Sequence, residues 1–97
     1  MIFLEEEIKK YVVKNLNYSL AVENYEDNTG KTSETIKHAW NLLQEYRTIR
    51  HSLSKEEELK KVKEISNAFD IAVKEIGVEN FTFYDDGNIN YIWKGEK

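Results

Sequence analysis

Three segments of the sequence carry residue types that bind phosphates or metal ions in other proteins. The first is Gly30-Lys31-Thr32, which stands directly before an expected helix, as at the end of a phosphate-binding loop. The complete motif needs another glycine five residues before Gly30, and this chain has Tyr25 there. The segment therefore indicates a loop glycine followed by a helix cap, and no nucleotide site is expected.

The two histidines are the second candidate for chemistry. His38 and His51 lie thirteen residues apart, whereas two metal-binding histidines on one helix typically stand at i and i+4. Glu34 and His38 do have that spacing, but such a pair on a polar helix face is usually solvated. A small enzyme that uses His38 and a nearby carboxylate as acid and base is the third of three hypotheses for function.

The third segment surrounds Gly87 and contains Asp85, Asp86 and Asn88, which match a fragment of a calcium-binding loop. The later ligands of such a loop are missing, including its bidentate glutamate. Aspartate and glycine are also what a tight turn needs, so the segment favours a turn. The chain has no cysteine either. The sequence therefore predicts no metal, no cofactor and no catalytic residues.

A group of basic residues supports a nucleic-acid hypothesis. Its members, on two expected helices, are Arg47, Arg50, Lys60, Lys61 and Lys63. The lysines alternate with glutamates, which is typical of a solvated face with ion pairs. The formal net charge is −4, from 18 acidic and 14 basic residues, whereas nucleic-acid binding relies on a basic field. A nucleic-acid-associated regulator is therefore the second hypothesis, and nucleic acid is not the favoured partner.

The aromatic residues favour a protein interface. They make up 12% of the chain and include six tyrosines and two tryptophans. A small core holds several of them, and tyrosine and tryptophan anchor many protein interfaces. Tyr84, Tyr91 and Trp93 are the interface candidates. The alternative is that they fill the core of a chain that has no disulfide bonds.

Three helices must position these residues, and they are expected at 3–16, 33–52 and 55–76. Apolar residues recur in each at i, i+3 and i+4, which is the pattern of an amphipathic helix. Thr32 or Ser33 is expected to cap the second helix. The third has the clearest limits, with a capping box that begins at Ser54 and a left-handed glycine cap, Gly77, at its end.

A C-terminal β-hairpin is expected at 79–84 and 88–93, around the Asp86-Gly87 turn signal. The side-chain pattern favours a three-residue loop, 85–87, which pairs Phe83 with Ile89. An isolated hairpin is marginally stable in water, so it must pack on helices or on a further strand.

Residues 18–25 are the ambiguous segment. Their alternation of apolar and polar side chains predicts a third strand, although Leu16 and Leu20 equally allow the first helix to continue. Together the elements predict an α+β fold, with three helices packed with the C-terminal β-hairpin. The 97 residues are expected to form a single domain.

Composition narrows the function classes. No secretory signal or transmembrane segment is recognised, so a cytoplasmic protein is expected. The favoured hypothesis is a non-enzymatic, acidic, protein-binding module. An inhibitor, an immunity-type protein or a regulator of a low-GC bacterium, its phage or a mobile element fits the size and the lysine-rich composition. The partner is expected to be another protein, and no binding to a membrane is expected. A homo-oligomer is compatible with the sequence.

Overall fold

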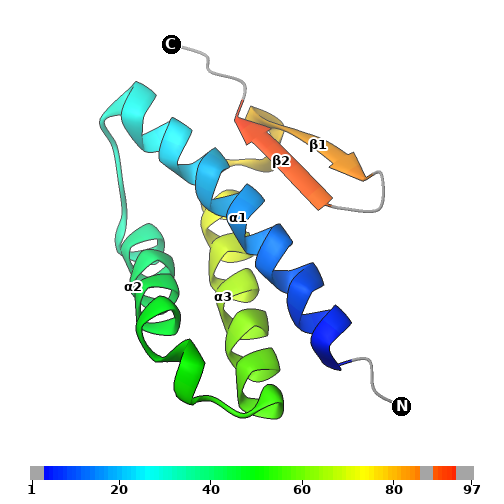
Figure 1. Ribbon diagram of the computed structural model, residues 1–97. Coiled ribbons are helices and arrows are strands. Elements are labelled where there is room, and N and C mark those ends of the chain that lie inside the picture. Colours follow the sequence, from blue (N-terminus) through cyan, green and yellow to red (C-terminus); the bar gives the residue numbers. More distant parts are fainter. Residues whose placement is uncertain (1–3, 86–88, 94–97) are drawn as a thin grey trace.

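The computed structural model describes residues 4–85 and 89–93 and consists mainly of three long helices (Figure 1). The helices are α1 (Leu4–Thr29), α2 (Glu34–Ile49) and α3 (Lys55–Ile76), with two short 3₁₀ helices, η1 (Arg50–Ser52) and η2 (Val78–Asn80). The strands are β1 (Phe81–Asp85) and β2 (Ile89–Trp93). Both α1 and α2 pack on α3, and β2 packs on α1.

The predicted α+β class is wrong, because the described chain is predominantly helical. Each strand has only five residues, and the two strands pair with each other alone. So small a pair does not form a layer on which three helices are stacked. The third strand expected at 18–25 is also wrong, because these residues lie within α1. The fold is a three-helix arrangement with one short strand pair docked on α1.

The first helix ends at Thr29 rather than at residue 16, and tertiary packing explains the difference. Tyr18, Ala21 and Val22 follow one another at helix spacing and are buried. Asn15, one residue before the expected end of the helix, donates its side-chain amide to the backbone carbonyl of Val62, at 3.1 Å. A buried asparagine with such a partner no longer competes for its own helix backbone. The helix therefore continues through the segment whose alternation predicted a strand.

The caps of α2 and α3 confirm two sequence predictions. Ser33 caps α2, and its hydroxyl accepts a hydrogen bond from the backbone N–H of Ile36 at 3.2 Å. Ser54 and Glu57 form the expected capping box, because each side chain accepts a hydrogen bond from the backbone N–H of the other, at 3.1 and 2.9 Å. These bonds satisfy backbone donors that a helix start otherwise leaves without partners.

The ends of α2 and α3 also differ in part from expectation. Gly77 terminates α3 with φ of 114°, a conformation that glycine adopts most easily, but its ψ of 113° places it outside the left-handed helical region. The second helix ends at Ile49, since the expected last turn tightens into η1.

The two strands pair in a register shifted by two residues from the expected one. Phe83 pairs with Tyr91, whereas the sequence predicts Ile89 as its partner. A shift of two keeps the same residues on each face, because side chains alternate with a period of two. Asp85 belongs to β1 rather than to a loop, and the rest of the predicted loop, including Gly87, lies outside the described residues.

The core lies where α1 and α2 meet α3 and where the strand pair meets α1. Its most deeply buried side chains are Val22, Ile36, Val62, Ile65, Phe69 and Val73. The ring of Phe69 stacks on Tyr18 and meets Trp40 edge-on, so all three helices contribute to this centre. Near the 30–33 connection, Trp40 of α2 donates its indole N–H to Glu26 of α1 at 3.1 Å. Away from that connection, α1 and α2 diverge in Figure 1.

Candidate functional site

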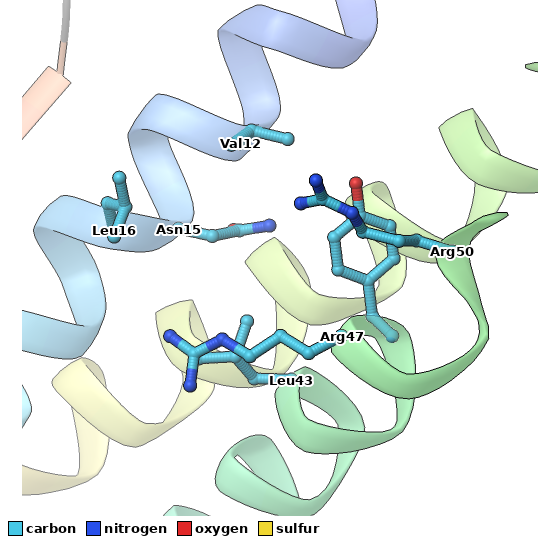
Figure 2. A pocket seen from close by; sticks show the side chains of 7 residues that line it. Val12, Asn15, Leu16, Leu43, Arg47 and Arg50 are labelled. Carbon is cyan, nitrogen blue, oxygen red and sulfur yellow. The ribbon is translucent and has the colours of Figure 1, made fainter.

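A hollow lies between α1 and α2 where the two helices diverge. Its volume is about 170 Å³, and its lining comes from α1, α2 and η1 (Figure 2): Val12, Asn15, Leu16, Leu43, Tyr46, Arg47 and Arg50. The lining is mainly apolar, and the side chains of Arg47, from α2, and Arg50, from η1, add positive charge to it (Figure 2). We call this hollow, with its continuation described next, the α1–α2 groove.

A second and wider hollow continues the α1–α2 groove toward the start of α1. It measures about 560 Å³ and shares Val12, Tyr46 and Arg50 with the first. Its other lining residues are more polar: Glu5, Ile8, Lys9, Val13, His51, Leu53, Lys55 and Glu58. The groove therefore has an apolar end beside Leu16 and a charged end beside η1.

Apolar side chains are exposed along α1: Leu16 lines the apolar hollow, Val13 lines the wider hollow, and Leu20 lies one turn beyond Leu16. Leu16 is 50% exposed, Leu20 is 56% exposed and Val13 is 39% exposed. Their spacing at i, i+3 and i+7 places them on one side of the helix. Single exposed apolar residues are common on soluble proteins, but a stripe that borders an apolar hollow marks a binding surface more often.

Arg47 and Arg50 carry the positive charge at the apolar end of the groove, and Lys9 and Lys55 line the wider hollow. Both are exposed, and neither forms an ion pair with any residue that the structure describes. Several lysines of the chain do pair with carboxylates: Lys37 with Glu34, Lys55 with Glu5 and Glu58, Lys61 with Glu45 and Glu64, and Lys74 with Asp70. The groove therefore presents two arginines whose charges the described part of the chain does not neutralise.

Tyr46 lines both hollows of the groove. Its hydroxyl donates a hydrogen bond to Glu58 of α3, at 2.7 Å. Burial, the hydrogen bond to Glu58 and the charge of that carboxylate raise the pKa of Tyr46 to about 12, although the charge of Arg50 acts in the opposite direction. The phenol therefore stays neutral at physiological pH and keeps the Glu58 carboxylate occupied.

Asn15 forms the polar part of the groove floor. Its amide group bonds to the Val62 carbonyl, and its carbonyl oxygen accepts a hydrogen bond from the hydroxyl of Ser66. Among the described residues no buried side-chain nitrogen or oxygen lacks a hydrogen-bond partner. The floor thus joins α1 to α3 and leaves no buried polar atom that calls for a ligand.

The structure separates the basic residues singled out in the sequence. Arg47 and Arg50 lie together at the groove, while Lys61 is held by two glutamates, with its Nζ 3.0 Å from the nearer carboxylate. The Nζ of Lys63 lies 5.9 Å from the centre of a tyrosine ring of α1, and Lys60 is exposed. None of the three lysines lines either hollow of the groove.

Trp93 lies in the core. It is 8% exposed, pairs with Phe81 and meets the ring of Tyr25 edge-on, with 5.8 Å between ring centres. An indole so deeply buried offers little surface to a partner, so its predicted interface role now requires a rearrangement. Tyr84 and Tyr91 lie on β1 and β2, and their side chains lie outside the described part of the structure, so their interface role stays a prediction.

The residues considered for metal or nucleotide binding do not form a common site among the described residues. His38 is exposed on α2, Gly30 has φ of 71° directly after α1, and Thr32 donates its hydroxyl to Glu26. Among residues 4–85 and 89–93, no group of three or more histidines, aspartates or glutamates is placed to hold a metal ion. Most of the acidic segment around Gly87 lies outside the described residues.

Sequence reasoning missed the role of Leu16 and Leu20. The sequence predicts Leu16 as the last residue of the first helix, at 3–16, and Leu20 as part of the strand at 18–25. Once the helix runs to Thr29, Tyr18, Ala21 and Val22 define the buried side, and the two leucines fall outside it. The available signal was the i, i+4 spacing of the two leucines, which also allowed the first helix to continue.

No family model, curated protein or solved structure matches this chain significantly. Within the described residues, no helix has the length and apolar character to cross a membrane. The function therefore has to be argued from the α1–α2 groove itself.

Proposed function

We propose that the chain is a non-enzymatic protein-binding module that engages another protein through the α1–α2 groove. The observation that carries this proposal is exposed Leu16, which lines a hollow together with Arg47 and Arg50, with Leu20 also exposed one turn farther along α1. Neither arginine forms an ion pair with a described residue. Protein interfaces combine an apolar core with arginine, which is enriched there while lysine, glutamate and aspartate are depleted. An inhibitor, an immunity-type protein or a regulator acts through such a surface, and we place the module in the cytoplasm.

The groove is suited to binding rather than to catalysis. Its apolar end lacks a nucleophile beside a base, and the Tyr46 hydroxyl and Glu58 already bond to each other. His38, the residue on which the enzyme hypothesis depends, lines neither hollow. The arrangement can bury an apolar side chain and pair with carboxylates.

Site-specific photo-crosslinking tests the proposal. A photoreactive amino acid is placed at Leu16 or Leu20, and at Lys60 as a control, because Lys60 is exposed and lies outside the groove. We expect the positions of Leu16, in the groove, and of Leu20, one turn farther along α1, to crosslink one protein in cells of the source organism. That protein is then purified and titrated calorimetrically against the wild-type chain and against Leu16→Asp and Lys60→Glu.

The proposal predicts that Leu16→Asp abolishes binding of the purified partner and that Lys60→Glu leaves it unchanged. Circular dichroism of both variants verifies that the helices persist. Equal binding of the partner by wild type and Leu16→Asp would show that another face carries the function. Crosslinking from Lys60 alone would have the same meaning.

A further inference from the structure

We infer that the α1–α2 groove receives an acidic amphipathic helix of the partner protein. This inference rests on the proposed function and names the chemistry of the binding segment. It follows from three features of the groove: its uncompensated charge, the spacing of its two arginines and the size of its apolar end.

The charge of the groove calls for carboxylates from outside. Arg47 and Arg50 have no acidic partner among the described residues, although acids outnumber bases in the chain. The carboxylates that line the wider hollow are engaged, since Glu58 accepts the Tyr46 hydroxyl and Glu5 pairs with a lysine at 3.6 Å. Guanidinium groups pair well with carboxylates because two parallel hydrogen bonds match their geometry.

The spacing of the arginines fits a helical partner. They stand at i and i+3 of the chain, the second directly after α2, so they are about one helical turn apart. Two acidic residues at i and i+3 or i+4 of a helix have their Cβ atoms about 5–6 Å apart, so their carboxylates can meet both arginines at once. An extended segment repeats its side chains on one face at a different interval and fits this pair less well.

The apolar end has room for one large side chain. Its volume of about 170 Å³ is close to the roughly 150 Å³ of a cavity that accepts benzene in another protein. Leu16 and Leu20 then offer a neighbouring ridge, one turn apart, for further apolar residues of the same helix. A helix that lies along this groove places apolar side chains at i, i+3 or i+4, and i+7, the usual pattern for such binding.

A second copy of the chain and a nucleic acid fit the groove less well. A twofold dimer through this face brings the same arginine pair of both copies toward one interface, where like charges repel. A nucleic acid needs a broad basic field, but the basic residues that line the groove, among them Lys9 and Lys55, lie beside Glu5 and Glu58, and the chain has a formal net charge of −4. The experiment below therefore tests a second copy and a nucleic acid as alternatives to the acidic helix.

A pair of designed peptides tests the chemistry. The acidic peptide is a fluorescein-labelled helix of about 18 residues, with leucines at i, i+4, i+7 and i+11 and glutamates on both flanks. Its basic twin carries lysine at every glutamate position. Fluorescence anisotropy against the wild-type protein should show binding of the acidic peptide that is stronger on the order of tenfold and weakens at high salt.

Charge reversal on the protein provides the specific control. The double variant Arg47→Glu/Arg50→Glu should reverse the preference, so that the basic peptide binds more tightly. The matched variant Lys31→Glu/Lys60→Glu has the same change in net charge at exposed positions outside the groove and should keep the wild-type preference. The comparison of the two peptides on wild-type protein does not depend on how any variant folds.

Three results would overturn the inference. They are equal binding of the two peptides, tighter binding of a short DNA duplex than of the acidic peptide, and a concentration-dependent dimer in analytical ultracentrifugation that Leu16→Asp dissociates. The proposed function fails separately, when Leu16→Asp does not affect the crosslinked partner. If that partner depends on Leu16 but its bound segment is neither acidic nor helical, the function stands and this inference falls.

Discussion

Replacement of Leu16 by alanine should cost the protein little stability, although the residue belongs to an apolar stripe. Full burial of a leucine side chain contributes about 1.5–3 kcal/mol, and Leu16 keeps 50% of its surface exposed. About half of that contribution is therefore at risk, on the order of 1 kcal/mol. Alanine also has a slightly better helix propensity than leucine, which offsets part of the loss.

Leu43 provides the matched control for this change. It lines the same hollow from α2 but is only 7% exposed, so Leu43→Ala should cost about 2–3 kcal/mol, at the lower end of buried leucine deletions because the hollow is already open to solvent. Urea denaturation followed by circular dichroism measures both variants. If Leu16→Ala costs as much as Leu43→Ala, Leu16 is a core residue and the account of the groove is wrong.

Three further changes test the structure around the groove. Trp93→Ala should lower the free energy of unfolding by about 3–5 kcal/mol, because the indole is buried against Tyr25; a loss below about 1 kcal/mol in a urea melt would restore it as an interface anchor. Asn15→Ala should cost about 1–3 kcal/mol and show a coupling to Ser66→Ala in a double-mutant cycle, because the two side chains share a buried hydrogen bond; purely additive losses would contradict this. The raised pKa of Tyr46, about 12, stabilises the fold fully below the unfolded pKa of about 10, and that contribution is lost as the pH rises through about 12; Tyr46→Phe should remove this part of the alkaline decline in urea midpoints, and an identical decline in the variant would refute the assignment.

The sequence predicted the helix ends that are fixed by capping residues close to them in the chain. The Ser54 capping box and Gly77 mark α3, whose bounds of 55–76 agree with the structure. Both signals act through the backbone within one turn of the helix end, so they do not depend on the rest of the fold. The cap at Ser33 was predictable for the same reason.

The extent of α1 was not predictable in this way, because it depends on contacts with α3 and β2. Asn15 is neutral or unfavourable as a local helix signal, and only the Val62 carbonyl, far away in the sequence, explains its place inside the helix. Leu20 fits an alternating strand and a helix equally well until the buried side is known. The error in α1 also hid the groove, since Leu16 becomes a surface residue only when the helix continues past it.

The binding surface was therefore predicted only in part. Arg47 and Arg50 were singled out for their charge, but for a nucleic-acid patch that included three lysines. Lys61 differs from the arginines in its ion pairs. It pairs with Glu45 of α2 and Glu64 of α3, whereas neither arginine has an acidic partner among the residues that the structure describes. Charge alone does not reveal such pairing, because it depends on how α2 and α3 face each other.

Chemical-shift mapping with the acidic peptide is the most direct test of whether the α1–α2 groove is the binding surface. If the peptide binds in the α1–α2 groove, it should shift the amide signals of residues 12–20 on α1 and 43–50 on α2 and η1 in ¹H–¹⁵N spectra of the labelled protein. The signals of β1 and β2 should remain in place. Shifts concentrated on the strand pair, or spread evenly over all three helices, would contradict the assignment of the α1–α2 groove as the binding surface.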